Sequence, residues 1–197
     1  MSISPLIRKR VSPEQSRGAA VAAARELLKT DGAAAVTLQS VAKRVGRTHA
    51  NLLHHFGTAA GLQRALAEDI AQTVAASIEG VIQQRRAGTA TERDVVDAMF
   101  EAFRREGAGE LIGWVALTRQ REALEPVVAT IERIIRTMRA LGDPRPVDRM
   151  TLALTLLAIG DSLAGEEVAR ACGLDRGAIR EVAATTIEAL AGSPLRD

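Results

Sequence analysis

Aromatic residues and cysteine are scarce in this sequence. Only 2% of its 197 residues are aromatic, namely three Phe and one Trp, and Tyr is absent. This argues against a protein that stacks single-stranded bases on clustered rings, and against most β-sandwiches, whose strands favour aromatic and β-branched residues. The single cysteine, Cys172, excludes an intrachain disulfide and any multi-cysteine zinc or iron–sulfur site.

Long apolar segments are also missing. The longest apolar run, residues 150–160, is about half the length that a membrane span needs. No apolar stretch follows the basic residues 8–10, where a secretory signal would have one. We therefore expect a cytoplasmic protein with no membrane partner. The hydrophobic share of 47% and the charged share of 25% are sufficient for a packed core.

Charge is distributed unevenly along the chain. Residues 1–57 carry nine basic and three acidic residues, a net charge of +6, which leaves −4 for the remainder. A basic N-terminal segment on a mildly acidic body is typical of a polyanion-binding module attached to a regulatory domain. The alternative is a fluctuation of solvated surface charge. The adjacent His54 and His55 would point to different sides of a helix, and His49 is five residues away, so we predict no metal site.

The residue pattern predicts an all-α fold. Alternating strand-type runs are absent, and residues that favour helices dominate. Ser12, Pro13 and Gln15 form the start of a first helix that ends near Gly32. Thr37 and Thr48 are N-cap candidates for two short helices, 38–45 and roughly 48–54. The remainder predicts about six helices: one from 58 to about 86, one from 91 that ends before 107, and four at 111–118, 122–141, 147–172 and 176–191, the last capped by Asp175.

The two short helices have the spacing of a helix-turn-helix. A short turn joins them, and Gly46 in this turn can adopt the positive φ that reverses the chain. The second helix would present Thr48, His49 and Ala50 at its outward N-terminus, the part of such a helix that enters a DNA major groove. The alternative is an ordinary corner between two helices.

Three segments of the chain carry a family resemblance. They read Ala23-Ala24-Arg25-Glu26-Leu27-Leu28-x3-Gly32, then Thr37-Leu38-x2-Val41-Ala42-x3-Gly46, and then Leu52-x2-His55-Phe56. Over about residues 15–65 they resemble the N-terminal domain of the TetR family of bacterial transcriptional regulators. The resemblance implies an N-terminal three-helix helix-turn-helix DNA-binding domain, residues 1–57 with a flexible basic arm at 1–11. It also implies a six-helix ligand-binding and dimerisation domain, residues 58–197.

The resemblance also implies DNA-contacting residues. Thr37 matches the position that caps the second helix and touches a phosphate, and Gln39 and His49 could read bases, although each could equally be a solvated surface residue. Leu53 stands where the family usually has a phosphate-binding Tyr, and Ala59 where it usually has a Lys, so we expect Arg47, His54 and the basic arm to compensate for these contacts. The predicted DNA-binding residues are Thr37, Gln39, Arg47, Thr48, His49, Ala50, Leu53, His54 and His55.

Two further sites are expected in the body. Its only large aromatics lie on helices that line ligand pockets in the family, which leads us to predict a mainly apolar effector site, with core packing as the alternative. The predicted ligand-binding residues are Phe100, Phe103, Trp114, Leu117, Ile135 and Leu157. Small residues and an apolar stripe on the last two helices predict a dimer interface, with an intramolecular core as the alternative. The predicted interface residues are Ala158, Ala164, Gly165, Ile179, Val182, Ala183 and Ile187.

These patterns lead to one functional hypothesis. We expect a homodimeric, ligand-responsive regulator, a repressor, that binds a pseudo-palindromic double-stranded DNA operator and is released by a small, mainly hydrophobic effector. We expect no enzymatic activity, no catalytic residue and no cofactor. The alternatives are a small helical enzyme that uses His54, His55 or Cys172, and a helical adaptor that has lost DNA binding.

Overall fold

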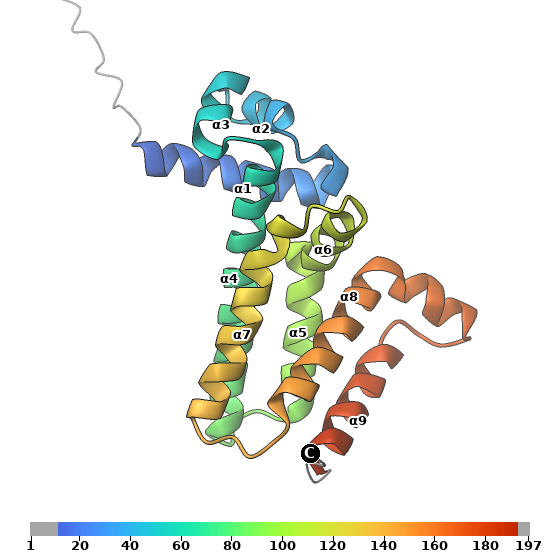
Figure 1. The fold of residues 1–197 in the computed structure, drawn as a ribbon. Coiled ribbons are helices and arrows are strands. Elements are labelled where there is room, and N and C mark those ends of the chain that lie inside the picture. Colours follow the sequence, from blue (N-terminus) through green and yellow to red (C-terminus); the bar gives the residue numbers. More distant parts are fainter. Residues whose placement is uncertain (1–11, 193–197) are drawn as a thin grey trace, which may run out of the picture.

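The structure, a computed structural model, is helical throughout the part that it describes. It describes residues 12–192, apart from the side chain of Arg121, and no strand occurs among them. The predicted basic arm at 1–11 lies outside the described residues. The elements in chain order are α1 (Pro13–Asp31), η1 (Ala33–Ala35), α2 (Leu38–Arg44), α3 (His49–Phe56), α4 (Ala59–Arg86), α5 (Glu92–Glu106), α6 (Ala108–Leu117), η2 (Arg121–Leu124), α7 (Glu125–Ala140), α8 (Val147–Ala171) and α9 (Ala178–Gly192) (Figure 1).

The N-terminal helix forms as the sequence predicts. Ser12 and Gln15 make a reciprocal capping box at the start of α1, and Pro13 occupies its first turn. Gly32, at a φ of 84°, ends the helix. The buried face of α1 includes Ala24 and Leu28, both fully inaccessible to solvent. This face packs against α2 and α4. It also approaches the turn between α5 and α6, where a Cβ atom added to Gly107 would lie 2.9 Å from the Leu28 side chain.

The body differs from the prediction mainly at helix boundaries. Gly107 adopts the left-handed conformation that ends α5, and α6 begins at the next residue rather than at 111. Gly109, which falls between two predicted helices, lies inside α6, and a Cβ there would approach that of Ser162 in α8 to 2.4 Å. Close packing of two helices therefore explains this glycine. The predicted helix 122–141 is divided into η2 and α7. The last helix, α9, begins at Ala178 rather than at 176, and Asp175, its predicted cap, accepts a hydrogen bond from the Gly177 amide.

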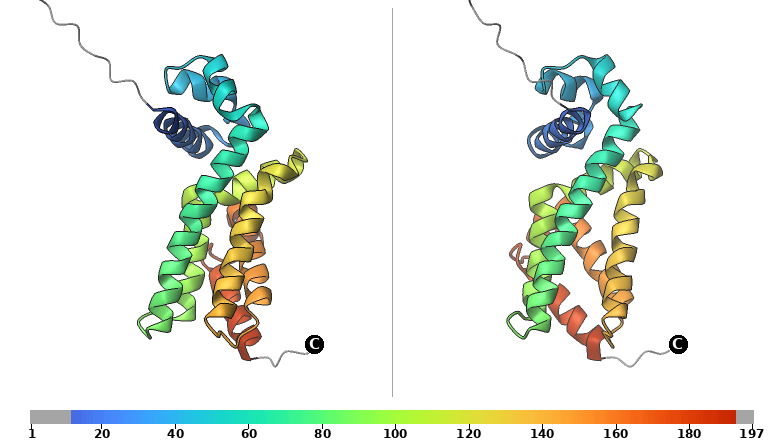
Figure 2. Two further views of the ribbon diagram at one scale, coloured as in Figure 1. Left: turned by 60° about the vertical axis from the view of Figure 1, so that its left-hand side comes forward. Right: turned by 90° about the vertical axis from the view of Figure 1, so that its left-hand side faces the viewer.

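The helices are arranged along one long element. Figures 1 and 2 show α1, α2 and α3 gathered at one end of the molecule, from which α4 extends through the body. In the body, α4 packs against α5 and α7, while α8 packs against α5, α6 and α9. One hydrophobic core runs through both parts, from Leu28 and Leu52 to Phe100 and Ile187. None of the helices within residues 12–192 has the length and apolar character to cross a membrane.

Candidate nucleic-acid interface and apolar cavity

The pair α2–α3 has the geometry of a helix-turn-helix. Thr37 caps α2 and Thr48 caps α3, each by accepting a hydrogen bond from the amide three residues ahead. Gly46, at a φ of 63°, lies in the turn between the helices. Leu52 and Phe56 on α3 are buried. Helix α3 ends two residues later than predicted, since Phe56 packs into the core before Gly57 ends the helix at a φ of 71°.

Most of the predicted DNA-binding residues are exposed around the start of α3. The exposed set consists of Thr37, Gln39, Arg47, Thr48, His49, Ala50, Leu53 and His54, while His55 is half-buried. The N-terminal turn of α3 therefore faces solvent with its free amides, which favour an anion such as phosphate. Lys43 and Arg47 add positive charge beside this turn and form no ion pair within the described residues, whereas Arg44 lies 3.9 Å from Asp31. The surface as a whole suits a polyanion.

Arg17 positions the end of α3, a role that no sequence pattern indicated. Its Nη1 donates a hydrogen bond to the carbonyl oxygen of His55 at 2.9 Å. Its guanidinium carbon lies 4.7 Å from the centroid of the Phe56 ring, a cation–π distance. Arg17 therefore fixes α3 against α1 from 38 residues away in the chain.

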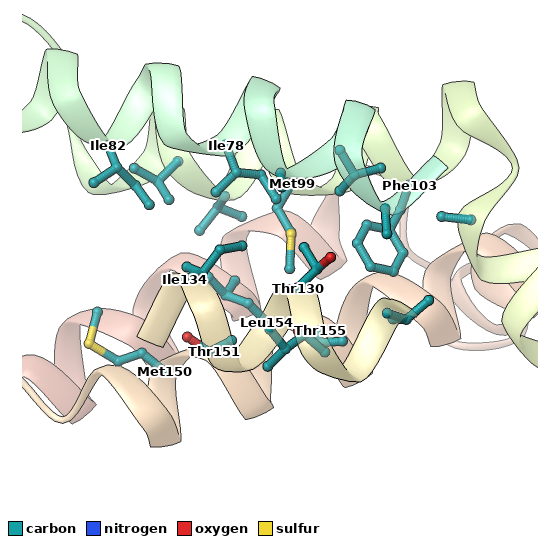
Figure 3. Close-up of a pocket in the computed structure, with 18 of the residues that line it drawn as sticks. Ile78, Ile82, Met99, Phe103, Thr130, Ile134, Met150, Thr151, Leu154 and Thr155 are labelled. Carbon is teal, nitrogen blue, oxygen red and sulfur yellow. The ribbon is translucent and has the colours of Figure 1, made fainter. Parts of the chain in front are cut away.

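A cavity lies inside the body, between α4, α5, α7 and α8 (Figure 3). The space open to the centres of water-sized groups is about 110 Å³. Its lining is mainly aliphatic, with Ile70, Ile78 and Ile82 on α4, Met99 on α5 and Leu154 on α8 among the contributors. Phe103 is its only aromatic contributor among the described residues. A concave, mostly apolar cavity with few polar groups is the usual form of a small-molecule site.

Charged residues at one part of this cavity neutralise one another. Glu92 bonds to Arg85 and to Arg145, each at 2.6 Å, and Arg145 also holds Asp143 at 2.5 Å. The hydrogen bonds from Arg145 keep the pKa of the Asp143 carboxyl below its usual value, although partial burial opposes the shift. The same pairing with Asp143 raises the pKa of Arg145. Two basic side chains thus pair with two acidic ones, so their formal charges balance.

The predicted ligand-binding residues do not gather at the cavity. Among the six, only Phe103 lines the cavity. Phe100 is 1% exposed in the core, with the Arg180 guanidinium 5.9 Å from its ring. Leu117, at the end of α6, is 86% exposed, and Trp114, Ile135 and Leu157 pack half-buried outside the cavity. Phe100 follows the lining residue Met99, and Ile135 follows the lining residue Ile134. One step along a helix turns the side-chain direction by about 100°, so these two side chains point away from the cavity.

Sequence reasoning missed the cavity's polar residues. Arg145 belongs to the predicted turn between α7 and α8, and nothing in the sequence indicated that its side chain returns to Glu92. Thr151 and Thr155 follow each other by one turn of α8, and this spacing was a usable signal that they share a face. Met99 and Met138 also line the cavity.

The predicted interface residues divide into two groups. Ala158, Ala183 and Ile187 are at most 1% exposed within one chain, so they cannot offer surface to a second chain. These three have the intramolecular role that was the alternative. Ala164 and Val182 are exposed, while Gly165 and Ile179 are half-buried. Helix α8 also carries exposed apolar residues that were not predicted, namely Leu152, Leu156, Leu163 and Val168, each at least 52% exposed.

Comparisons with known proteins agree with this architecture. Residues 20–66 match the family model described as "Bacterial regulatory proteins, tetR family". The chain is similar to the multidrug binding protein EbrR, solved in complex with imidazole, at 17% identity and a TM-score of 0.67 over 91% of this chain and 96% of that one. It is also similar to a TetR-family transcriptional regulator from Pectobacterium atrosepticum, at 18% identity and a TM-score of 0.59 over 95% and 100%. A third similar structure is a protein of unknown function from Rhodococcus sp. RHA1, at 21% identity and a TM-score of 0.62 over 94% and 99%. No curated protein sequence matches the chain.

These findings define the class of the protein. It has the all-α fold of TetR-family transcriptional regulators, as predicted. Residues 20–66 carry the sequence of the family's helix-turn-helix DNA-binding domain, which confirms the resemblance seen in the sequence.

Proposed function

We propose that the protein is a ligand-responsive transcriptional repressor that binds a pseudo-palindromic DNA operator as a homodimer in the cytoplasm. The observation that carries this proposal is the exposed start of α3, with Thr48, His49 and Ala50 facing solvent beside Lys43 and Arg47. A helix end of this kind, on a rigid two-helix unit, enters the major groove of DNA. The proposed contact residues are the nine given above, and the proposed DNA-binding unit is residues 1–57.

The homodimer is supported by the apolar surface of the last two helices. Leu152, Leu156 and Leu163 are 61%, 60% and 52% exposed on α8, and Val182 is 54% exposed on α9. Burial of such residues across a two-fold axis stabilises a bundle of two helices from each chain. The proposed interface keeps Ala164, Gly165, Ile179 and Val182 and adds these leucines. The two α3 helices would then reach successive major grooves, about 34–36 Å apart.

The proposed effector site is the apolar cavity within the body, residues 58–197. Helix α4 connects this cavity to the DNA-binding end, since Ile78 and Ile70 line the cavity and Leu62, nearer its start, is fully buried in the core. A ligand that moves α4 would change the separation of the two α3 helices and so weaken DNA binding. A coupling free energy of about 1–3 kcal/mol corresponds to roughly a 5- to 150-fold change in affinity. We propose no catalytic role for the chain.

Selection from random duplex DNA tests the proposal directly. The full chain is expected to enrich a palindrome with half-site centres one helical turn apart, about 10–10.5 base pairs, or a multiple of it. The affinity should fall steeply with salt, because basic side chains displace counterions from phosphate. Binding without sequence preference, or no binding to duplex DNA at low salt, would overturn the proposal. A displacement screen on the selected palindrome then identifies effectors.

A further inference from the structure

One buried polar atom among the described residues that line the cavity lacks a hydrogen-bond partner. Thr155 on α8 is 9% exposed, and its Oγ1 is buried with no partner in the structure. It is one of the residues that line the cavity (Figure 3). A buried hydroxyl without a partner lowers stability, since it loses its hydrogen bonds to water on folding. A ligand in the cavity can restore this bond, because a hydroxyl both donates and accepts.

Thr151, one turn earlier on α8, is a natural comparison. It also lines the cavity, but its Oγ1 donates a hydrogen bond to the carbonyl oxygen of Val147 at 2.6 Å. The two threonines therefore differ in whether the side-chain hydroxyl still needs a hydrogen-bond partner. Thr151 already has a partner for its hydroxyl within its own helix, whereas Thr155 has none.

The charged residues that line the cavity, together with Asp143 beside Arg145, leave no net charge for a ligand to neutralise. Two cations, Arg85 and Arg145, face two anions, Glu92 and Asp143, in contacts of 2.5–2.6 Å. Their side chains are between 10% and 25% exposed. A charged ligand would have to separate one of these partly buried pairs and leave its partner uncompensated, which is costly. The arrangement thus disfavours both anionic and cationic ligands.

The remaining surface of the cavity suits an alkyl chain. Isoleucine, valine and leucine predominate, and Phe103 is the single ring. Met99, Met138 and Met150 also contribute, and unbranched methionine side chains adapt to ligand shape. The space of about 110 Å³ for the centres of water-sized groups exceeds what one water molecule needs, so the cavity has room for a small organic molecule.

We infer that the effector is a small, uncharged, mainly aliphatic molecule with one polar group that hydrogen-bonds to Oγ1 of Thr155. This inference rests on the proposed function, because it assumes that the cavity is the effector site. It adds the chemical class of the ligand and the residue that recognises it.

Calorimetric titration of the full chain with three matched probes tests this inference without DNA. The probes are 1-octanol, octanoate and octylammonium, which share a chain length and differ in charge. We expect 1-octanol to bind at least tenfold more tightly than either charged probe. Thr155→Val should weaken 1-octanol binding by about 2- to 13-fold, the net value of a neutral hydrogen bond. Thr155→Ser should retain tight binding, and Thr151→Val should leave the affinity within twofold of that of the unmodified chain.

Thermal unfolding without a ligand provides a second measurement. Thr155→Val removes an unpaired buried hydroxyl at nearly constant volume, so it should raise the Tm by about 2–4 °C. A lower Tm for this variant would mean that the hydroxyl has a structural partner, and would overturn the inference. Tightest binding of octanoate or octylammonium would also overturn the inference, as would equal effects of Thr155→Val and Thr151→Val. The same holds if none of the three probes binds while another compound releases the operator. Failure to bind duplex DNA would overturn the proposed function and leave the calorimetric result intact.

Discussion

Arg25 in α1 donates a hydrogen bond from Nη1 to Oε2 of Glu106 at the end of α5, over 2.7 Å. Its Nη2 also bonds to Asp69 at 2.5 Å and to Thr73 at 2.9 Å, both on α4. One guanidinium therefore joins the first helix of the DNA-binding end to two helices that line the cavity. The side chains of Arg25 and Glu106 are only 17% and 16% exposed, so solvent screens this pair weakly.

Replacement of Arg25 should destabilise the protein more than replacement of its neighbour Lys29. Arg25→Met leaves the partly buried Glu106 and Asp69 without their shared partner, and we expect the free energy of unfolding to fall by about 1–3 kcal/mol. Lys29 also contacts Glu106, at 3.3 Å, but it is 33% exposed, so Lys29→Met should cost less than about 1 kcal/mol. Urea unfolding measures both values. Equal losses would contradict the central role given to Arg25.

Helix starts were predictable because each depends on residues close together in the chain. Ser12, Thr37 and Thr48 were predicted at helix starts, and predicted helices also begin at 58 and 91; the side chains of all five residues accept a hydrogen bond from an amide three residues ahead. The helix-turn-helix is likewise local, since α2, Gly46 and α3 are contiguous. Its exposed and buried faces follow from helical periodicity alone.

The cavity was not predictable in the same way. Phe100 and Phe103 lie three residues apart on α5, yet only Phe103 reaches the cavity, while the ring of Phe100 lies 5.9 Å from the guanidinium of Arg180 on α9. The periodicity of one helix shows that it has an apolar face, but not which neighbour covers it. Arg145 depends on a partner 53 residues away in the chain. Such pairings arise only from the packing of several helices.

Substitutions at Thr48 should separate the capping of α3 from the contact with DNA. Thr48 Oγ1 accepts a hydrogen bond from the Asn51 amide at 3.2 Å. Thr48→Asp keeps a capping oxygen and should leave stability unchanged, but its charge should repel phosphate and weaken DNA binding by at least tenfold. Thr48→Ala loses the cap and should lower the free energy of unfolding by about 1 kcal/mol. Thermal unfolding and a gel shift test the pair, and undiminished DNA binding by Thr48→Asp would exclude contact at this helix end.

Gln39 and His49 should determine sequence preference rather than assembly. Both side chains are exposed, so the double replacement Gln39→Ala, His49→Ala removes no packing. We expect it to abolish the preference for the selected palindrome, since a good base contact contributes about 1–3 kcal/mol of discrimination, while non-specific binding persists. Binding-site selection with the variant provides the measurement, and light scattering verifies that the dimer remains. An unchanged selected sequence would mean that other residues read the bases.

Charge on the exposed face of α8 should prevent dimer formation. Leu163 and Val128 are both 52% exposed within one chain, Leu163 on α8 and Val128 on α7. Leu163→Glu should leave one chain folded but bury an unpaired carboxylate in a dimer, so we expect half the assembly mass by light scattering and loss of operator binding. Val128→Glu is the matched control and should remain dimeric. If Leu163→Glu has the same mass as the unmodified chain, the interface lies elsewhere.

Acid should destabilise the protein in part through Asp143. The hydrogen bonds from Arg145 keep the pKa of Asp143 below its usual value of about 3.9 in the folded chain. Since the folded-state pKa is lowered, the stabilisation is complete above about pH 4 and is lost as the pH falls through the lowered pKa. Asp143→Asn should lower the free energy of unfolding at pH 7 by about 1–3 kcal/mol. Below pH 4 the free energy of unfolding of this variant should then fall less than that of the unmodified chain. Glu125→Gln, which removes an exposed carboxylate on α7, controls for the change in net charge. Urea unfolding between pH 7 and pH 3 measures the difference, and parallel pH profiles for Asp143→Asn and the unmodified chain would show that this pair does not contribute to acid stability.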